Sequence, residues 1–263
     1  MPDADATWSP APDLNRRLAS TRFHEIRRFT SVDSTNRHLL HEAARGCAEG
    51  VVAVADVQTA GRGRHGRSWT AAPGAALLVS VLLRPGLAPE RLHLVTLAAG
   101  VAAADAVREV AGFDALVKWP NDLVFDDRKL AGILAEAALT GNGGADGVVV
   151  GMGLNLRSDA FPPEIAEIAT ACDRHGAEAV DRDDLLVAWL HALDGHLGAL
   201  DNVVAAAAAR SATLGRNVRV ELARGTFTGV ATRMTPEGYL VVTRANGTEE
   251  IVTAGDVIHV RAG

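Results

Sequence analysis

The densest group of chemically active side chains is GRGRHGRSW, residues 61–69. These nine residues hold three glycines, three arginines and one histidine, and they close on Trp69. Glycine lets backbone N–H groups approach a ligand closely, and successive N–H groups can form a concave anion site. Arginine adds a planar fork of donors that suits carboxylate and phosphate. The segment therefore predicts a loop that is disordered when empty and ordered by a polyanion, with Trp69 as a latch or stacking plate.

Positive charge is concentrated on a chain that is acidic overall. The formal net charge is −6, yet no Asp or Glu occurs between Val57 and Pro89, where four arginines fall. This indicates a pocket for an anionic small molecule, and it argues against a whole surface that grips nucleic acid. Of the 26 basic residues 24 are arginine, and the only lysines are Lys118 and Lys129. Chance in an arginine-biased composition is one explanation of these two lysines, and a shared site is the other.

Four further polar motifs accompany the Gly/Arg segment. KWPNDL (118–123) puts a lysine at the end of a strand, just before a turn. RKLAGILAE (128–136) carries the second lysine into a strand, and GMGLNL (151–156) ends a strand on glycine and asparagine. DSTN (33–36) offers hydroxyls and an amide at a helix start, where backbone N–H groups are free. Each motif stands at the end of a regular element, so the surrounding elements must bring them together.

Hydrophobic periodicity predicts those elements. One helix starts near Asp33–Thr35 and stops at Gly46, a second spans Leu92–Val110, and two more lie before Leu214. The predicted strands are 23–29, 51–57, 76–84 and 147–156, with short ones around ALVKW, LVF and LAGILAEAAL.

After Leu214 short β segments follow one another closely, with turn signals such as Asn246-Gly247 between them. NVRVEL, TFTGVATRM, GYLVVT and EEIVTA predict a small appended β-barrel. We therefore expect a loose N-terminal segment at 1–20, a main domain at 21–214 and a small β domain at 215–263.

Composition excludes several classes of protein. The chain is 48% apolar and 22% charged, which is typical of a globular protein with a sizeable core. Its two cysteines are far apart, which favours a reducing compartment over a disulfide framework or zinc site. No signal peptide and no apolar run of about 20 residues is evident. We expect a cytoplasmic protein that does not bind membranes.

Taken in order, DSTN, QTAGRGRHGRSW, KWPNDL, KLAGIL and GMGLN resemble the biotin protein ligases. The resemblance extends to the small C-terminal β domain and makes chance an unlikely source of the two lysines. It implies an α+β fold: a mixed sheet flanked by helices, like that of class II aminoacyl-tRNA synthetases, with an appended Src-homology-3-like barrel. It also implies an ATP-dependent ligase. Such an enzyme joins biotin to AMP, then transfers biotin to a lysine of the biotin carboxyl carrier domain of a carboxylase.

The resemblance also implies roles for particular residues. The biotin pocket would comprise Ser34, Thr35, Asn36, Gln58, Gly61, Arg62, Gly63, Arg64, Lys129, Gly132 and Ile133. The ATP and adenylate side would comprise Arg64, Arg67, Trp69, Lys118, Asn121 and Asn155. Lys129, Arg64 and Lys118 would be the catalytic cations, with Mg²⁺ carried by the nucleotide. Asp122 would orient the acceptor lysine, or serve only as a turn residue.

The sequence also departs from parts of the family pattern. Many members carry an N-terminal DNA-binding domain, for which residues 1–20 are too short, so we expect no DNA binding. The adenine-stacking aromatic is hard to place, and Phe161 is one candidate. A carrier's Met-Lys-Met motif is absent, so the acceptor is another protein; we expect a monomer or weak homodimer. The alternatives are a lipoate or octanoate ligase of the same fold, and a non-catalytic nucleic-acid-binding module.

Overall fold

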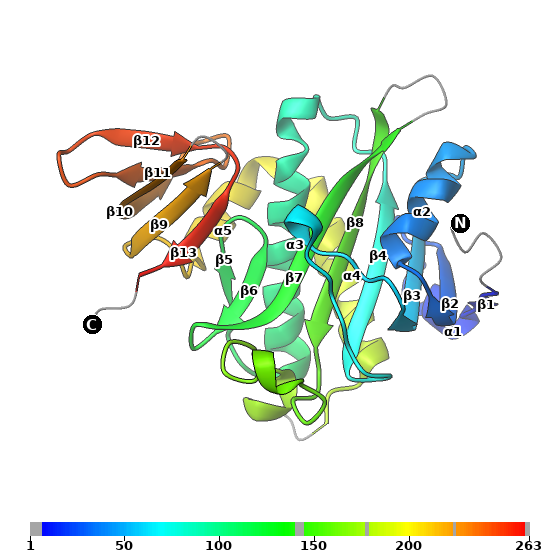
Figure 1. Cartoon of the computed structure of the whole chain (residues 1–263). Helices are drawn as coiled ribbons and strands as arrows, with labels where there is room; N and C mark the ends of the chain where they lie inside the picture. Colours follow the sequence, from blue (N-terminus) through cyan, green and yellow to red (C-terminus); the bar gives the residue numbers. More distant parts are fainter. Residues whose placement is uncertain (1–6, 140–144, 177–178, 223–224, 261–263) are drawn as a thin grey trace.

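The chain builds two β-sheets, one large and mixed, the other small and antiparallel (Figure 1). The computed structural model describes residues 7–139, 145–176, 179–222 and 225–260. The large sheet has strand order β1-β2-β3-β4-β8-β7-β6-β5, in which only β2 and β3 run parallel. Its strands are β1 Ser9–Pro10, β2 Glu25–Val32, β3 Val51–Gln58, β4 Ala76–Leu83, β5 Leu116–Lys118, β6 Asp122–Phe125, β7 Arg128–Leu139 and β8 Ala145–Asn155. The predicted mixed sheet is thereby confirmed.

Helices cover both faces of the large sheet (Figure 1). They are α1 Pro12–Arg17, α2 Thr35–Ala44, α3 His93–Ala106, α4 Arg182–Gly198 and α5 Val203–Ala209. Strand alternation separates the two cores: Val52 and Val54 of β3 pack with α3 and α4, whereas Val51, Ala53 and Ala55 pack with α2. Both faces are buried in β4 and in residues 51–55 of β3, which explains why these segments are apolar except for Ser80.

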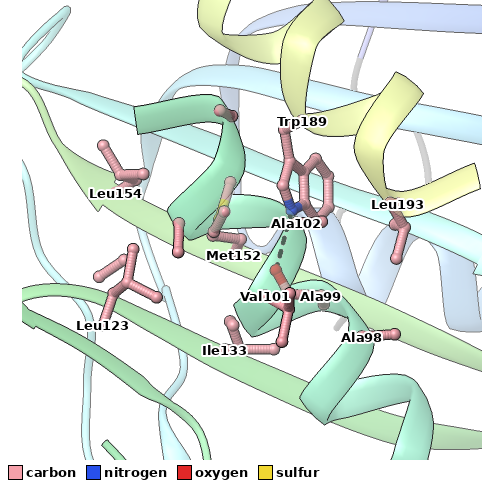
Figure 2. Packing of buried hydrophobic residues seen from close by; sticks show 14 of the residues in the cluster. Ala98, Ala99, Val101, Ala102, Leu123, Ile133, Met152, Leu154, Trp189 and Leu193 are labelled. Carbon is pink, nitrogen blue, oxygen red and sulfur yellow. Dashed lines mark hydrogen bonds between the residues drawn. The ribbon is translucent and has the colours of Figure 1, made fainter. Parts of the chain in front are cut away.

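The core beneath the site is formed by α3, which lies between the sheet and α4 (Figure 2). Its centre is the alanine- and glycine-rich run from Leu97 to Ala104, whose small side chains let both neighbours approach closely. Trp189 of α4 is fully buried, and its Nε1 donates to the Ala99 carbonyl over 3.2 Å. Ile133 and Met152 from the sheet complete this layer. The strands that carry the site are therefore supported from behind by a dry core.

The small sheet has strand order β12-β11-β10-β9-β13. Its strands are β9 Asn217–Leu222, β10 Gly225–Met234, β11 Leu240–Thr243, β12 Glu249–Val252 and β13 Asp256–His259. The sequence predicts the first four, and β13 is an addition. Trp119 joins the two sheets, because its ring is buried and its Nε1 donates to the Gly238 carbonyl.

The predicted loose N-terminus is wrong over its second half. Residues 1–6 lie outside the described residues, but Ser9–Pro10 pairs with β2 and Pro12–Arg17 is helical. Leu14 and Leu18 are buried in the main core. These two leucines anchor the segment in the core. A helix of six residues is too short to show a hydrophobic periodicity in the sequence.

The predicted helix to Val110 is also shorter than expected. It ends at Ala106 and continues as a wider π-turn over Val107–Ala111, which closes at Gly112 with a φ of 78°.

Candidate active site

A cavity of about 250 Å³ opens beside the C-terminal half of the large sheet. It is lined by the start of α2, the Gly/Arg segment, the KWPND turn, β7, β8 and the first residues of β13. The predicted site residues that line it are Ser34, Thr35, Asn36, Gln58, Arg62, Gly63, Arg64, Arg67, Trp69, Lys118, Asn121, Asp122, Lys129, Gly132 and Ile133. Motifs separated by up to about a hundred residues thus meet in one place.

Glycines on two neighbouring strands create the room for this site. Gly132 of β7 is paired with Gly153 of β8, and an added Cβ would lie 3.0 Å and 2.4 Å, respectively, from atoms of the Trp69 ring. At Gly151 an added Cβ would lie only 2.0 Å from the Asn36 Oδ1. The glycines of GMGLN therefore admit the Trp69 ring and the Asn36 amide to the sheet.

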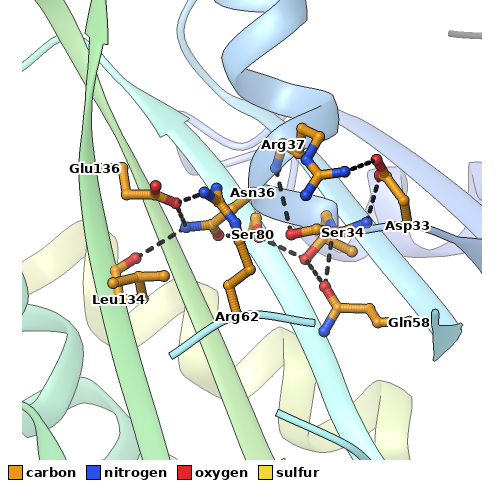
Figure 3. Close-up of polar contacts among 10 residues, drawn as sticks. Asp33, Ser34, Asn36, Arg37, Gln58, Arg62, Ser80, Leu134 and Glu136 are labelled. Carbon is orange, nitrogen blue, oxygen red and sulfur yellow. Dashed lines mark hydrogen bonds and ion pairs between the residues drawn. The ribbon is translucent and has the colours of Figure 1, made fainter. Parts of the chain in front are cut away.

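One end of the cavity is uncharged, and we call Ser34, Thr35, Asn36, Gln58 and Ser80 the neutral end (Figure 3). Ser34 caps α2, where its hydroxyl accepts from the Arg37 N–H. The backbone N–H and the hydroxyl of Thr35 both donate to the Gln58 Oε1, over 2.8 and 3.1 Å. Ser80 Oγ lies 2.7 Å from the Thr35 hydroxyl and 2.6 Å from the Asn36 Oδ1. Because these groups already bond to one another, the pocket wall is fixed before any ligand arrives.

The other end is positively charged, and we call Arg62, Arg64, Arg67, Lys118 and Lys129 the cationic end. The Gly/Arg segment closes on itself through Gly63 N–H to Arg67 carbonyl (2.7 Å) and Trp69 N–H to Gly61 carbonyl (2.9 Å). Each arginine has an acceptor in the protein: Glu136 for Arg62, Asn121 for Arg64 and Asp256 for Arg67. Self-repulsion of the loop is thereby offset; its ordering by ligand stays a prediction.

The two lysines lie beside the same carboxylate. Lys129 Nζ is 2.7 Å from the Asp122 Oδ1 and 5.6 Å from the centre of the Trp69 ring. Burial lowers the pKa of Lys118, with Asp122 opposing that shift and Lys129 adding to it. Burial likewise lowers the pKa of Arg64. Desolvated cations of this kind interact strongly with an anion that enters the site.

Three predicted residues take other places. Gly61 lies behind the loop, where an added Cβ would meet the Trp69 carbonyl at 2.3 Å. Asn155 is buried outside the cavity and donates to the Thr170 carbonyl over 3.0 Å, so it holds the chain behind Lys129. The Phe161 ring stands 5.9 Å from the Arg174 guanidinium and does not line the cavity. Asp122 does line it, but its carboxylate is paired with Lys129.

Sequence reasoning missed three polar residues of the site. Ser80 is the lone hydroxyl in the apolar run ALLVSVLLR, and that interruption was the available signal. Glu136 is likewise an isolated acid in LAGILAEAAL. Asp256 gave no signal, because it reaches the cavity from the small β domain through the packing of two separate sheets.

Comparison with known proteins places this geometry in a family. The Biotin/lipoate A/B protein ligase family profile matches residues 28–155, and the Biotin protein ligase C terminal domain profile matches residues 213–260. The biotin–[acetyl-CoA-carboxylase] ligase of Mycobacterium tuberculosis is 36% identical over 99% of this chain and 100% of its own length. The chain belongs to the biotin protein ligase family. It is an ATP-dependent ligase.

Further members of the ligase family are similar to this chain in sequence and in fold. The bifunctional ligase/repressor BirA of Bacillus spizizenii is 31% identical over 86% of this chain and 72% of its own. Among solved structures, the Aquifex aeolicus biotin protein ligase in complex with biotin and ATP superposes with a TM-score of 0.78. It is 27% identical over 90% of this chain and 99% of its own. The expected fold, including the barrel-like C-terminal domain, is thereby confirmed.

Proposed function

We propose that this ligase activates biotin with ATP to biotinyl-5′-AMP and transfers biotin to a lysine of the biotin carboxyl carrier domain of a biotin-dependent carboxylase. The observation that carries the proposal is the union of a neutral and a cationic end in one cavity. Biotin has the matching polarity, because its cyclic urea is an uncharged donor and acceptor and its valerate ends in a carboxylate. The names of the relatives support the same reaction.

The first step brings a carboxylate onto the α-phosphate of ATP, and both groups are anions. The carboxylate oxygen forms a bond to phosphorus as pyrophosphate leaves, so charge develops on phosphoryl oxygens. Lys129, now paired with Asp122, would bridge the two reactants, and Lys118 and Arg64 would contact phosphate oxygens; all three residues line the cavity, which supports these roles. Fixed cations in a partly desolvated site stabilise such a transition state.

Mg²⁺ enters this scheme as part of the nucleotide substrate, bound to its phosphates. Two carboxylates, Asp122 and Asp256, line the cavity, and both already face cations. Hard oxygen donors of this type suit Mg²⁺, so these two carboxylates would be the residues that help to hold the ion beside the phosphates.

The second step transfers biotin to an amine. The acceptor lysine, as the free amine, attacks the carbonyl carbon of the mixed anhydride, AMP leaves and an amide bond forms. The Gly/Arg segment lines the cavity and, ordered over the anhydride, would keep water from it. Among the described residues no side chain in the cavity is an obvious base, so positioning supplies most of the rate.

The alternative substrates, lipoate and octanoate, carry no polar head group that could form hydrogen bonds with the neutral end. A dithiolane or an alkyl chain offers no hydrogen bond to Gln58, Thr35 and Asn36. Lone pairs and N–H groups that these residues do not satisfy among themselves would then lose water without a new partner, which would cost affinity. We propose further that the protein acts in the cytoplasm as a monomer or weak homodimer and binds no DNA. No helix within the described ranges is long and apolar enough to cross a membrane.

The decisive test is biotin-dependent exchange of labelled pyrophosphate into ATP, with lipoate and octanoate as parallel substrates. Exchange with biotin alone supports the proposal. Exchange with only lipoate or octanoate would keep the chemistry and replace the substrate. No exchange with any acid by folded protein would favour the binding-module alternative, and salt-sensitive binding to random RNA would then support it.

A further inference from the structure

We propose that Glu136 is a positioning residue that couples the Gly/Arg segment to the head-group pocket, a role that rests on the proposed function. Glu136 lies on β7, and one of its oxygens serves both ends of the cavity (Figure 3). Its Oε2 accepts from the Asn36 Nδ2 over 2.8 Å and from the Arg62 Nη2 over 2.7 Å. This is a direct link between the neutral end and the cationic end.

The contact with Asn36 fixes the orientation of a buried amide. Asn36 is 4% exposed, and its Nδ2 also donates to the Leu134 carbonyl over 3.2 Å. Its Oδ1 faces the Ser80 hydroxyl at 2.6 Å. A flipped amide would turn its oxygen toward the Glu136 carboxylate and the Leu134 carbonyl, which repel it. Glu136 therefore helps to fix the orientation of the Asn36 amide, together with the Leu134 carbonyl and the Ser80 hydroxyl.

The contact with Arg62 fixes one nitrogen of a guanidinium that lines the cavity. The Arg62 side chain is 34% exposed and that of Glu136 24%, so the pair is partly shielded from water. The Arg62 Nε is buried and has no protein partner among the described residues. Buried donors are rarely left unpaired, so the position of this guanidinium depends all the more on the ion pair with Glu136. Loop closure and head-group recognition then depend on the same carboxylate.

Glu136 has a second, electrostatic function. With Arg62 present its charge is compensated; without Arg62 a carboxylate faces a site that must bind anionic substrates. Arg62→Ala should therefore lose more than the arginine's own contacts. Removing the charge as well, in Arg62→Ala/Glu136→Gln, should recover part of that loss.

The test is pyrophosphate exchange with wild type, Glu136→Gln, Arg62→Ala and the double variant. Glu249→Gln is the matched control, because Glu249 accepts from Arg233 over 2.7 Å on the surface of the small sheet, far from the cavity in sequence and fold. Glu136→Gln should raise KM for biotin about tenfold with kcat within about threefold, since charge-assisted bonds have about twice the strength of neutral ones. The double variant should exchange about threefold or more faster than Arg62→Ala at subsaturating biotin.

Several outcomes would overturn this role. One is a KM for biotin in Glu136→Gln that equals that of the Glu249→Gln control. Another is an exchange rate in the double variant that equals the product of the two single effects, because the two residues would then act independently. Glu136→Asp keeps the charge but is shorter by one methylene, so it should also raise KM; wild-type behaviour in that variant contradicts the proposal even if Glu136→Gln folds poorly. Absence of biotin exchange in the wild type would instead refute the proposed function itself.

Discussion

The neutral end of the cavity is buried and bonded within itself, whereas the cationic end is partly exposed and built from ion pairs. Ser80 is inaccessible to solvent and Asn36 nearly so, while the Arg67 side chain is 61% exposed and that of Lys129 37%. The neutral end is a preorganised pocket, and its rearrangement would leave buried polar groups unpaired. The cationic end consists of ion pairs whose carboxylates the substrate anions can replace. The neutral end should therefore control binding, and the cationic end should control the chemical step.

The largest expected effect on pyrophosphate exchange comes from Lys129→Ala, which removes one cation of the cationic end. Removing one preorganised donor to developing charge costs roughly 100- to 1,000-fold in kcat, so exchange at saturating biotin should fall by that amount, with a smaller rise in KM for biotin from the lost carboxylate contact. Circular dichroism and thermal melting should match wild type, because Lys129 is partly exposed. A folded variant that exchanges at the normal rate would place Lys129 outside the site.

Next is Gly151→Ala, which breaks the neutral end. The new Cβ would stand 2.0 Å from the Asn36 Oδ1, so Asn36 must move away from Ser80. Overpacking of this kind costs about 1–3 kcal/mol, and KM for biotin should rise roughly 10- to 100-fold with kcat nearly preserved. Gly195→Ala is the control, because an added Cβ there meets nothing within 4 Å. A fall in kcat without a rise in KM for biotin would contradict the assignment of binding to the neutral end and of the chemical step to the cationic end.

A smaller effect concerns pH. Burial lowers the pKa of Lys118, so the folded protein loses this cation at a lower pH than an ordinary lysine would. Exchange should decline as pH rises through that lowered pKa. Lys118→Arg, which stays charged, should move the alkaline decline to higher pH. The measurement is kcat/KM against pH for both proteins, because kcat/KM reports the pKa values of the free enzyme; coincident profiles would assign the decline to another group.

The smallest effect should come from Asp256→Asn, which removes a carboxylate that pairs with the exposed Arg67 and lies 3.8 Å from the Arg64 guanidinium. Exposed ion pairs contribute about 0–1 kcal/mol, so exchange should change by no more than roughly fivefold. The change should shrink as salt is raised, because exposed charges are screened. Pyrophosphate exchange at low and high ionic strength measures this, and a large salt-independent loss would mean that Asp256 contacts the reactants.

Most strands and helices follow from periodicity, since their boundaries fall at residues such as Gly46 and Ser34 with clear local preferences. The exceptions depend on distant partners. The two-residue strand at Ser9–Pro10 exists because β2 offers an edge, and β13 exists because β9 does. Short segments of this kind have little intrinsic preference and take their structure from the strand beside them.

At the site, residue types and their spacing predict which chemistry is available: a glycine-rich arginine loop, two lysines, and hydroxyls and amides at a helix start. These are local properties that can be recognised along the chain. The contacts between these groups come from the three-dimensional fold: Glu136 joins Asn36 to Arg62, Asp122 pairs with Lys129, and Asp256 reaches the cavity from a second sheet. Such contacts depend on the pairing of strands and the docking of sheets, which bring together groups that no sequence pattern relates.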